Sequence, residues 1–432
     1  MKKIIINSLL FIAAANLLIS CQKDYGNLNS PTVESFTSNA SVSDLNNLVT
    51  GSESGMRTNM GLYLDDVGSI GRENYRFSAS EPRYVTDLLG ADNSVLSNSN
   101  FYITNPWASR YRVVKNCNIL IQAAKNSTLV SPTDKAGYIG FAQTIIAYQL
   151  LLNLNLTDSN GIRLDVSNPA ALGPIVPPAQ ALPAIQSLLD SGAAALQAGT
   201  IAFPLSNGFA GFNDAAGLTQ FNRALSARVQ IYMSNWSGAL TALGLSFYGL
   251  NLPLDLGVYN VFSSGSGDQL NPAFIPQLQT GEVRVANPSF AADILPGDDR
   301  ISKATLRPVA SLDNLSSDRD VWVYTSSTAP MAIIRNEELI LIYAEANIQL
   351  YNFPEALKAL NLIRSKHNLP NYSGTVDQPS LINEMLYERR YSLYMEGHRW
   401  IDVRRYNMLN TLPLDRPNDN VWSEFPLPVS EQ

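Results

Sequence analysis

The pattern of hydrophobic and polar positions predicts a mostly helical body. Apolar residues recur every three or four positions through seven stretches, as expected for helices that bury one face. The predicted helices cover residues 107–125, 138–154, 181–198, 218–243, 333–350, 354–367 and 380–396. Proline stands at or just before several of the expected helix starts, where its missing N–H is not needed. Strand-like stretches are short and scattered, so the predicted fold class is mainly α with a few short strands.

Two of the predicted helical regions share a spacing of small residues. Ala344 and Ala356 are 12 positions apart, and so are Ala227 and Ala239. Small residues at this separation let two antiparallel helices pack closely, as in a tetratricopeptide hairpin, although ordinary helical hairpins remain an alternative. Stacked hairpins of this kind build scaffolds and concave binding surfaces. The expected helix pairs cover residues 107–154, 181–243, 333–367 and 380–409.

Two long stretches, 55–105 and 245–332, carry few helical signals but many aromatic side chains beside polar ones. Long loops in a compact domain are usually functional or mobile. Sugar rings present apolar C–H faces ringed by hydroxyl groups, which suit flat aromatic side chains with polar neighbours. The alternative for each aromatic residue is packing inside the core or the loop. The candidate ligand contacts are Arg72, Tyr75, Arg76, Tyr84, Tyr102, Trp322 and Tyr324.

The start of the chain has the pattern of an export signal. Two lysines precede an apolar run at 4–19, which is too short for a comfortable membrane span. Small residues and then Cys21 follow the run, as in a lipoprotein cleavage site. We interpret residues 1–20 as a lipoprotein signal peptide and Cys21 as the lipid-bearing residue, with an ordinary secretory signal as the alternative. Residues 21–43 are polar and are expected to form a flexible tether.

Composition and motifs argue against several classes of function. The formal net charge is −7, and no basic tract could follow a nucleic-acid backbone. His367 and His398 lie outside any metal-ligand motif, and no phosphate-binding glycine loop is present. Glu388 and Glu396 are separated by about 12 Å along a helix, too far for the carboxylate pair of a glycosidase. Adjacent arginines are also expected to lower the pKa of these carboxyl groups. We therefore predict no catalytic site, no metal and no cofactor.

The segment 384–406 mixes charged and apolar residues on one expected helical face. A single stripe at helical spacing contains Met385, Arg389, Ser392 and Glu396. Ions that are partly removed from water need partners, so the segment is either an active site or an ionic clamp. The carboxylate spacing favours the clamp. The predicted structural ionic cluster consists of Arg389, Glu396, Arg399 and Asp402. We expect it to tie the last helical hairpin together.

Six stretches of this sequence are similar to motifs of one protein family. They cover residues 107–118, 298–300, 335–346, 356–370, 388–406 and 425–431. In their order and spacing they resemble the SusD/RagB outer-membrane nutrient-binding lipoproteins of the phylum Bacteroidota. The resemblance extends over most of the mature chain and is strongest at its C-terminus.

The resemblance implies a tetratricopeptide-like helical hairpin scaffold with an irregular loop-rich lobe. It implies an N-terminal SusD-like region at 44–270 and a C-terminal SusD/RagB region at 271–432, merged into one globular body. The family is not enzymatic. Its members are lipid-anchored at the outer face of the outer membrane, and they pass glycans or peptides to a SusC-type TonB-dependent transporter. We therefore expect oligosaccharide as the ligand, with a peptide- or protein-binding lipoprotein of the same architecture as the alternative.

Overall fold

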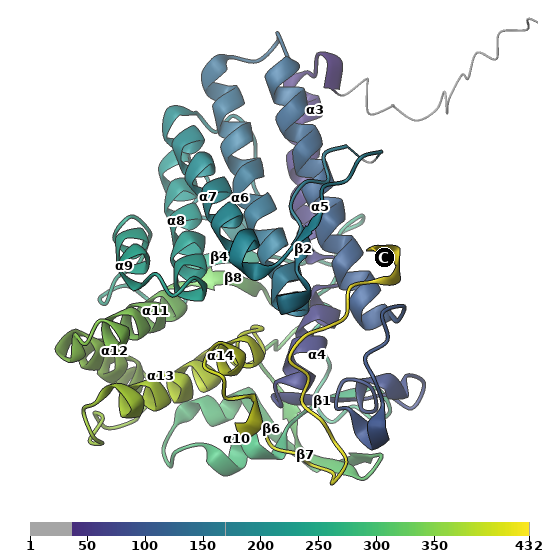
Figure 1. Cartoon of the computed structure of the whole chain (residues 1–432), viewed down its shortest axis with the longest axis vertical. Helices are drawn as coiled ribbons and strands as arrows, with labels where there is room; N and C mark the ends of the chain where they lie inside the picture. The colour runs from purple at the N-terminus through teal and green to yellow at the C-terminus, as the bar shows by residue number, and fades with distance from the viewer. Residues whose placement is uncertain (1–36, 169, 432) are drawn as a thin grey trace, which may run out of the picture.

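The computed structural model of the chain describes residues 37–168 and 170–431. Its helices are labelled as in Figure 1: α3 (Val42–Arg57), α4 (Met60–Ile70), α5 (Phe101–Asn126), α6 (Pro132–Thr157), α7 (Pro178–Ala198), α8 (Ala215–Tyr232), α9 (Trp236–Gly244), α10 (Pro288–Asp293), α11 (Asn336–Gln349), α12 (Phe353–Lys366), α13 (Gln378–Ser392) and α14 (Arg399–Arg405). The strands are β1 (Asn74–Phe77), β2 (Ile162–Arg163), β3 (Ile175–Val176), β4 (Gly257–Asn260), β5 (Val283–Ala286), β6 (Ala304–Leu312), β7 (Leu315–Val321) and β8 (Met331–Arg335). The predicted mainly α fold class is confirmed.

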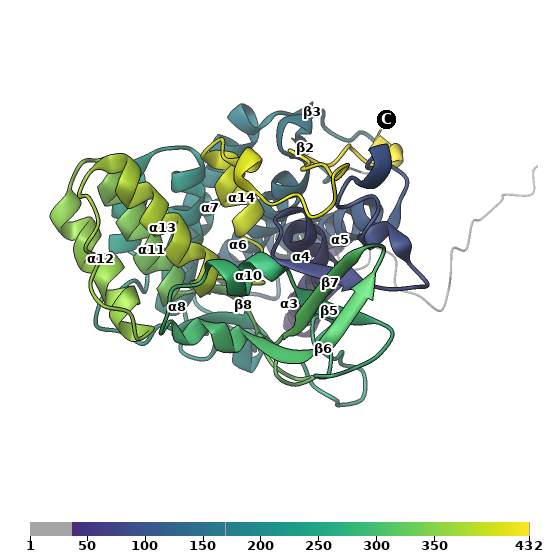
Figure 2. The same ribbon diagram turned by 90° about the horizontal axis from the view of Figure 1, so that it is seen from below.

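Helix α6 is the centre of the helical scaffold. It packs between α5 and α7, and α8 continues the same row (Figure 1). Within the described ranges, the region 132–160 is the single helical stretch long and apolar enough to cross a membrane. Its most apolar window is 89% buried inside the protein, which identifies it as a core helix. Helices α11–α13 form a second group beside this row, and the largest sheet lies below α4 (Figure 2).

The two small-residue repeats are two helical hairpins, α8 with α9 and α11 with α12. The residues that set the spacing are all fully buried: Ala227, Ala239, Ala344 and Ala356. Each hairpin turns at a residue with positive φ, Ser234 in the first and Tyr351 in the second. The single helix predicted at 218–243 is therefore wrong, whereas the hairpin expected from Ala227 and Ala239 is confirmed, because the chain reverses between Tyr232 and Trp236.

Two long helices, α3 and α4, lie where none was predicted, and so does the short helix α10. Helix α3 begins with a capping box, in which Ser41 and Asp44 bond to each other's main-chain N–H. Every residue of α4 except Leu62 is buried, so α4 has no polar face to reveal its helical period. Helix α3 begins at Val42, inside the segment predicted as the tether. The predicted signal peptide and Cys21 lie outside the described residues.

The largest sheet has the strand order β1-β5-β7-β6 and positions the loop-rich lobe. In the antiparallel register Arg76 faces Arg284, and Tyr75 faces Val285. Alternation along the strands places Tyr75 and Phe77 in an apolar cluster with Val285. Arg76 and Arg284 point to the opposite face, where α4 supplies Asp65. The sheet therefore presents an ionic face to α4 and an apolar face to the loop that follows β1.

Candidate ligand-binding site

Four partly exposed side chains gather where β1, the next loop and the start of α5 meet. This arginine–aromatic patch consists of Arg76, Arg83, Tyr84 and Phe101. The rings of Tyr84 and Phe101 meet edge to face, with centroids 5.3 Å apart. The Arg83 guanidinium lies 4.9 Å from the Phe101 centroid, and that of Arg76 lies 5.8 Å from the Tyr84 centroid. The patch thus offers two aromatic rings with two cations beside them.

A polar frame fixes Arg83 against Phe101. Its Nε and Nη2 donate to the two carboxylate oxygens of Glu81, at 2.6 and 2.5 Å. Its Nη1 donates to Asn100 Oδ1 at 2.7 Å. Asn100 Nδ2 and the Tyr102 hydroxyl both donate to Asp87 Oδ2. The hydrogen bond from Arg83 lowers the pKa of Glu81, so this pair remains ionised at neutral pH. The frame holds the Arg83 guanidinium over the Phe101 ring, and both side chains stay partly exposed at the surface.

A buried ion pair between β5 and α4 lies next to the patch residue Arg76. Arg284 makes a two-pronged ion pair with Asp65, at 2.5 and 2.8 Å. Arg76 lies farther from its carboxylate partners, 3.8 Å from Asp65 and 3.4 Å from Glu282. Burial and the charge of Asp65 raise the pKa of the Tyr84 hydroxyl, which therefore stays protonated and can donate a hydrogen bond. The patch combines donors and acceptors with apolar surface, as sites for polar ligands do.

A surface hollow of about 350 Å³ lies next to the patch. The ends of β1 and β5 and one side of β6 line it, including Ser78, Val283 and Arg307. Ser78 Oγ donates to Glu282 Oε1 at 2.8 Å, and the other oxygen of Glu282 faces Arg76. Glu282 thus joins the wall of the hollow to the patch, and the two together form the candidate site.

The structure argues against ligand contact for four of the seven residues predicted for that role. Arg72, Tyr75, Tyr102 and Tyr324 are each no more than 5% exposed. Tyr324 donates to the main-chain oxygen of Met395, and Tyr75 accepts from Asn287 Nδ2. These aromatic residues pack in the core because an apolar ring with one satisfied polar atom is favourable there. Their loop position in the sequence does not reveal this burial.

Arg76, Tyr84 and Trp322 are partly exposed and remain candidates. Arg76 and Tyr84 belong to the patch. Trp322 follows β7 and packs against Phe274, with ring centroids 6.2 Å apart. Within the described residues, no ring contact or hydrogen bond joins Trp322 to the patch. The prediction did not include Arg83 and Phe101, although their positions beside Tyr84 and Tyr102 placed them in the same loop region.

The predicted ionic cluster is divided among several partners. Arg389 Nε donates to Asp402 Oδ2 at 2.7 Å, which joins α13 to α14. Glu396 lies beyond the end of α13 and pairs instead with Arg335 at 2.8 Å. Arg399 Nε donates to the main-chain oxygen of Gly71. The helical stripe ends at Ser392 because Met395 and Gly397 both take positive φ values. Of the four predicted residues, Arg389 and Asp402 therefore form the one pair that links α13 directly to α14.

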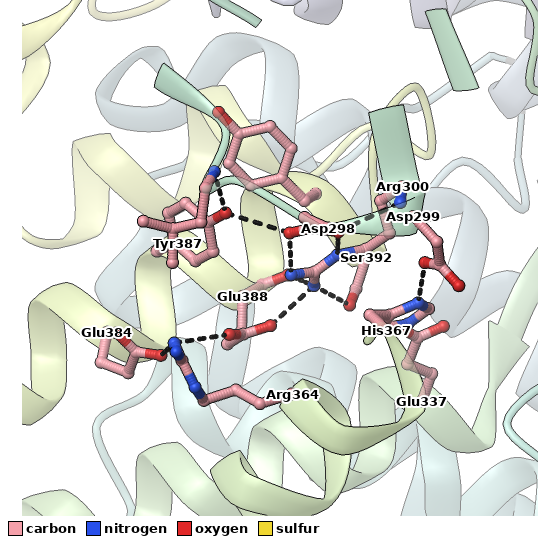
Figure 3. Close-up of polar contacts among 12 residues, drawn as sticks. Asp298, Asp299, Arg300, Glu337, Arg364, His367, Glu384, Tyr387, Glu388 and Ser392 are labelled. Atoms are coloured by element: carbon pink, nitrogen blue, oxygen red, sulfur yellow. Dashed lines mark hydrogen bonds and ion pairs between the residues drawn. The ribbon is translucent and has the colours of Figure 1, made fainter. Parts of the chain in front are cut away.

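A second ionic network, which the sequence did not predict, surrounds Arg300 (Figure 3). The Arg300 guanidinium donates two hydrogen bonds to Asp298 and one to Glu388 Oε2, the last at 2.6 Å. Arg364 lies on the far side of Glu388 and pairs with Glu384. Burial raises the pKa of Glu388 to about 8, so the expected lowering by neighbouring arginines is wrong. The network joins the loop before β6 to α12 and α13.

Glu73 gives the fold a testable dependence on pH. It is buried after α4, where its Oε1 accepts from the main-chain N–H of Met395, and burial raises its pKa to about 7. A carboxyl group whose folded pKa is raised stabilises the fold fully below its unfolded pKa of about 4.3 and loses that effect as pH rises through about 7. The free energy of unfolding of Glu73→Gln, measured relative to that of the parent, should therefore increase by about 1–3 kcal/mol when the pH is raised from about 5 to about 8. Urea unfolding at both pH values measures this, and a constant difference would contradict it.

Within the described residues, no group of three or more histidine, cysteine, aspartate or glutamate side chains is placed to hold a metal ion. The geometry of the patch is that of a binding surface, with rings and fixed polar groups at the surface.

Three comparisons with known proteins converge on one family. Residues 301–423 match the model of the SusD family. A curated relative, the SusD-like protein P38 of Formosa agariphila, is 37% identical over 83 residues, which are 17% of this chain and 16% of that protein. The matched stretch is thus a small part of the relative's length.

The fold resembles solved structures over most of its length. A SusD superfamily protein from Bacteroides vulgatus superposes with a TM-score of 0.71 at 16% identity, covering 90% of this chain and 96% of the other. Surface glycan-binding protein A from Bacteroides thetaiotaomicron has a TM-score of 0.70 at 12% identity, covering 92% and 97%. A SusD-like carbohydrate binding protein from Bacteroides vulgatus has a TM-score of 0.66 at 15% identity, covering 85% and 83%. These likenesses show a SusD-like fold, which is tetratricopeptide-like.

Proposed function

We propose that this chain is a SusD/RagB family protein that captures oligosaccharides at the cell surface, which its match over residues 301–423 and the fold it shares with SusD-like structures support. SusD family proteins are non-catalytic binding proteins, so its role is to bind a ligand and not to convert it. It delivers the oligosaccharide to a partner SusC-type TonB-dependent transporter in the outer membrane. The lipid on Cys21 and the tether after it hold the protein there, facing the exterior.

The observation that carries the proposal is the arginine–aromatic patch beside the 350 Å³ hollow. Oligosaccharides need flat apolar surface for their C–H faces and fixed donors and acceptors for their hydroxyl groups. The patch supplies two rings, and Glu81, Arg83 and Asn100 hold one another in fixed positions around it. Two solved structures of this fold carry names that describe glycan or carbohydrate binding, which supports the same ligand class.

Calorimetry with purified maltohexaose, cellohexaose, xylohexaose and mannohexaose tests the proposal, with a set of hexapeptides as the comparison. We expect at least one oligosaccharide to bind, and we expect Phe101→Ala or Arg83→Ala to weaken that binding about tenfold, or about 1.4 kcal/mol. The matched controls are Tyr351→Ala, an exposed ring on the α11–α12 turn, and Arg112→Ala, an exposed arginine on α5. Both controls should bind like the parent.

Three outcomes would count against the proposal. Binding of hexapeptides without any oligosaccharide would favour the peptide-binding alternative. Parent-like affinity in both patch variants would place the site elsewhere on the molecule. An equal loss of affinity in the patch variants and in their controls would mean that the substitutions act through general instability, and the patch would lose its support.

A further inference from the structure

A long segment near the end of the chain crosses the molecule without regular structure over most of its length. This strap, residues 412–431, runs from the region after α14 past α4 to the side of α5 (yellow in Figure 1). Its far end contains a short 3-10 turn, Val429–Glu431. There Glu431 accepts from Trp107 Nε1 at 3.0 Å and pairs with Arg163. The end of the strap therefore bonds to the helical scaffold, and the rest of the strap contacts a second region of the chain.

That other region is the site loop, residues 81–100, which carries Arg83 and Tyr84. Along the described chain, the strap donates five hydrogen bonds to this loop, four to main-chain oxygens and one to a side chain. They are Asn420 N to Leu89 O at 2.9 Å, Trp422 Nε1 to Asp87 O at 2.8 Å, Arg416 Nη2 to Val85 O at 2.5 Å, Val429 N to Asn98 O at 3.0 Å and Asn418 Nδ2 to Asp92 Oδ1 at 3.1 Å. The acceptors are spread over most of the loop's length, from Val85 to Asn98.

The strap and the loop are also in close contact. Gly90 has a φ of 68°, and a Cβ atom there would lie 2.6 Å from the Cβ of Asn420. No larger residue fits at that point without moving the strap. The loop itself contains only two short 3-10 turns, at Pro82–Tyr84 and Ala91–Asn93. A loop with so little regular structure relies on outside contacts for a single conformation.

Buried groups of the body hold the strap in turn. Arg72 donates to the main-chain oxygens of Pro413 and Asn420, at 3.0 and 2.7 Å. Trp400 Nε1, on α14, donates to the main-chain oxygen of Trp422 at 2.8 Å. The strap is thus fixed to buried side chains on one side and bonded to the site loop on the other.

We infer that the strap positions the ligand-binding loop, so that affinity depends on strap residues outside the patch. The inference rests on the proposed function, because it concerns the same site. A loop held in its binding conformation loses less conformational entropy when a ligand binds, and loosening the loop weakens binding without removing a contact. The residue assigned to this positioning role is Trp422, whose indole N–H bonds to Asp87, the residue that also anchors Asn100 and Tyr102.

Two matched substitutions test the inference. Trp422→Phe removes the indole donor to the site loop, whereas Trp107→Phe removes an indole donor to the same strap at Glu431, two residues beyond the last strap residue that bonds to that loop. The probe is the hexasaccharide that binds the parent most tightly in the panel above. We expect Trp422→Phe to weaken binding about 2- to 10-fold, the range for one lost hydrogen bond, and to speed amide exchange in residues 85–100. Trp107→Phe should leave affinity per folded molecule unchanged, even if it lowers stability.

Each other result overturns the inference. If Trp422→Phe speeds exchange in the loop but binds with parental affinity, the position of the loop does not control binding. If exchange in residues 85–100 is unchanged, the strap does not hold the loop. If both variants lose affinity equally, the strap acts through overall stability. Loss of binding in Phe101→Ala together with parental affinity in Trp422→Phe would overturn the inference alone and leave the proposed function standing.

Discussion

Arg300→Ala should lower the free energy of unfolding by about 3–5 kcal/mol, the usual cost of removing one partner from a buried ion pair. The Arg300 side chain is 1% exposed, and both of its carboxylate partners are fully buried. Figure 3 shows the two carboxylates bonded to the guanidinium. Without the guanidinium, Asp298 would have to stay charged without its cation or take up a proton, and Glu388, whose pKa is raised by burial, would lose a hydrogen-bond donor. Asp298 keeps hydrogen bonds from the Tyr387 hydroxyl and from the main-chain N–H of residue 300, and Glu388 keeps a 3.5 Å contact with Arg364. Urea unfolding at neutral pH measures the change.

The control for Arg300 is Lys358→Ala, which breaks an ion pair with Glu355 at the surface of α12. That lysine is 61% exposed, so its loss should cost less than about 0.5 kcal/mol. Affinity per folded molecule should be the same in both variants, because neither residue lies near the patch. A loss of less than about 1 kcal/mol in Arg300→Ala would show that the network adds little to the fold.

Arg72→Ala should also destabilise the fold by about 3 kcal/mol or more, because several buried acceptors would lose their donor at once. The Arg72 guanidinium is fully buried and donates to main-chain oxygens of Ser69, Ile70, Leu89, Pro413 and Asn420. These oxygens belong to the end of α4, the site loop and the strap. Thermal or urea unfolding measures the effect, and Arg112→Ala is the exposed control.

The result for Arg72 separates two roles. As a ligand contact, which the sequence suggested, its replacement would weaken oligosaccharide binding and leave stability nearly unchanged. As a structural donor, its replacement lowers stability first, and Arg72→Lys rescues only part of it because an ammonium group cannot reach acceptors on three segments together. Unchanged stability with lost affinity would restore the original assignment.

The helical scaffold could be predicted because its signals are local. The spacing of Ala344 and Ala356 at the α11–α12 hairpin and the periodic apolar positions of α5 and α6 follow from one helical face meeting a neighbour. Helix α4 was missed because it is buried on nearly all sides, which removes the contrast between faces that a periodicity search needs.

The candidate site could be predicted only in part, since burial in a loop is decided by distant segments. Tyr75 and Tyr84 look alike in the sequence. The register of β1 against β5 places Tyr75 in the apolar cluster, whereas Tyr84 lies in the turn after it and stays partly exposed. Arg72 is buried because the strap, more than 300 residues later, covers it. No local pattern contains that information.

The most direct test of the account is a map of where an oligosaccharide binds. Amide hydrogen exchange of the parent protein, with and without a saturating amount of the tightest-binding hexasaccharide, gives that map. The account predicts slower exchange in residues 76–101 and around the hollow beside β6, with helices α8, α9, α11 and α12 unaffected. Protection confined to those helical hairpins, with no change at 76–101, would contradict it and would place binding in the groove of the scaffold.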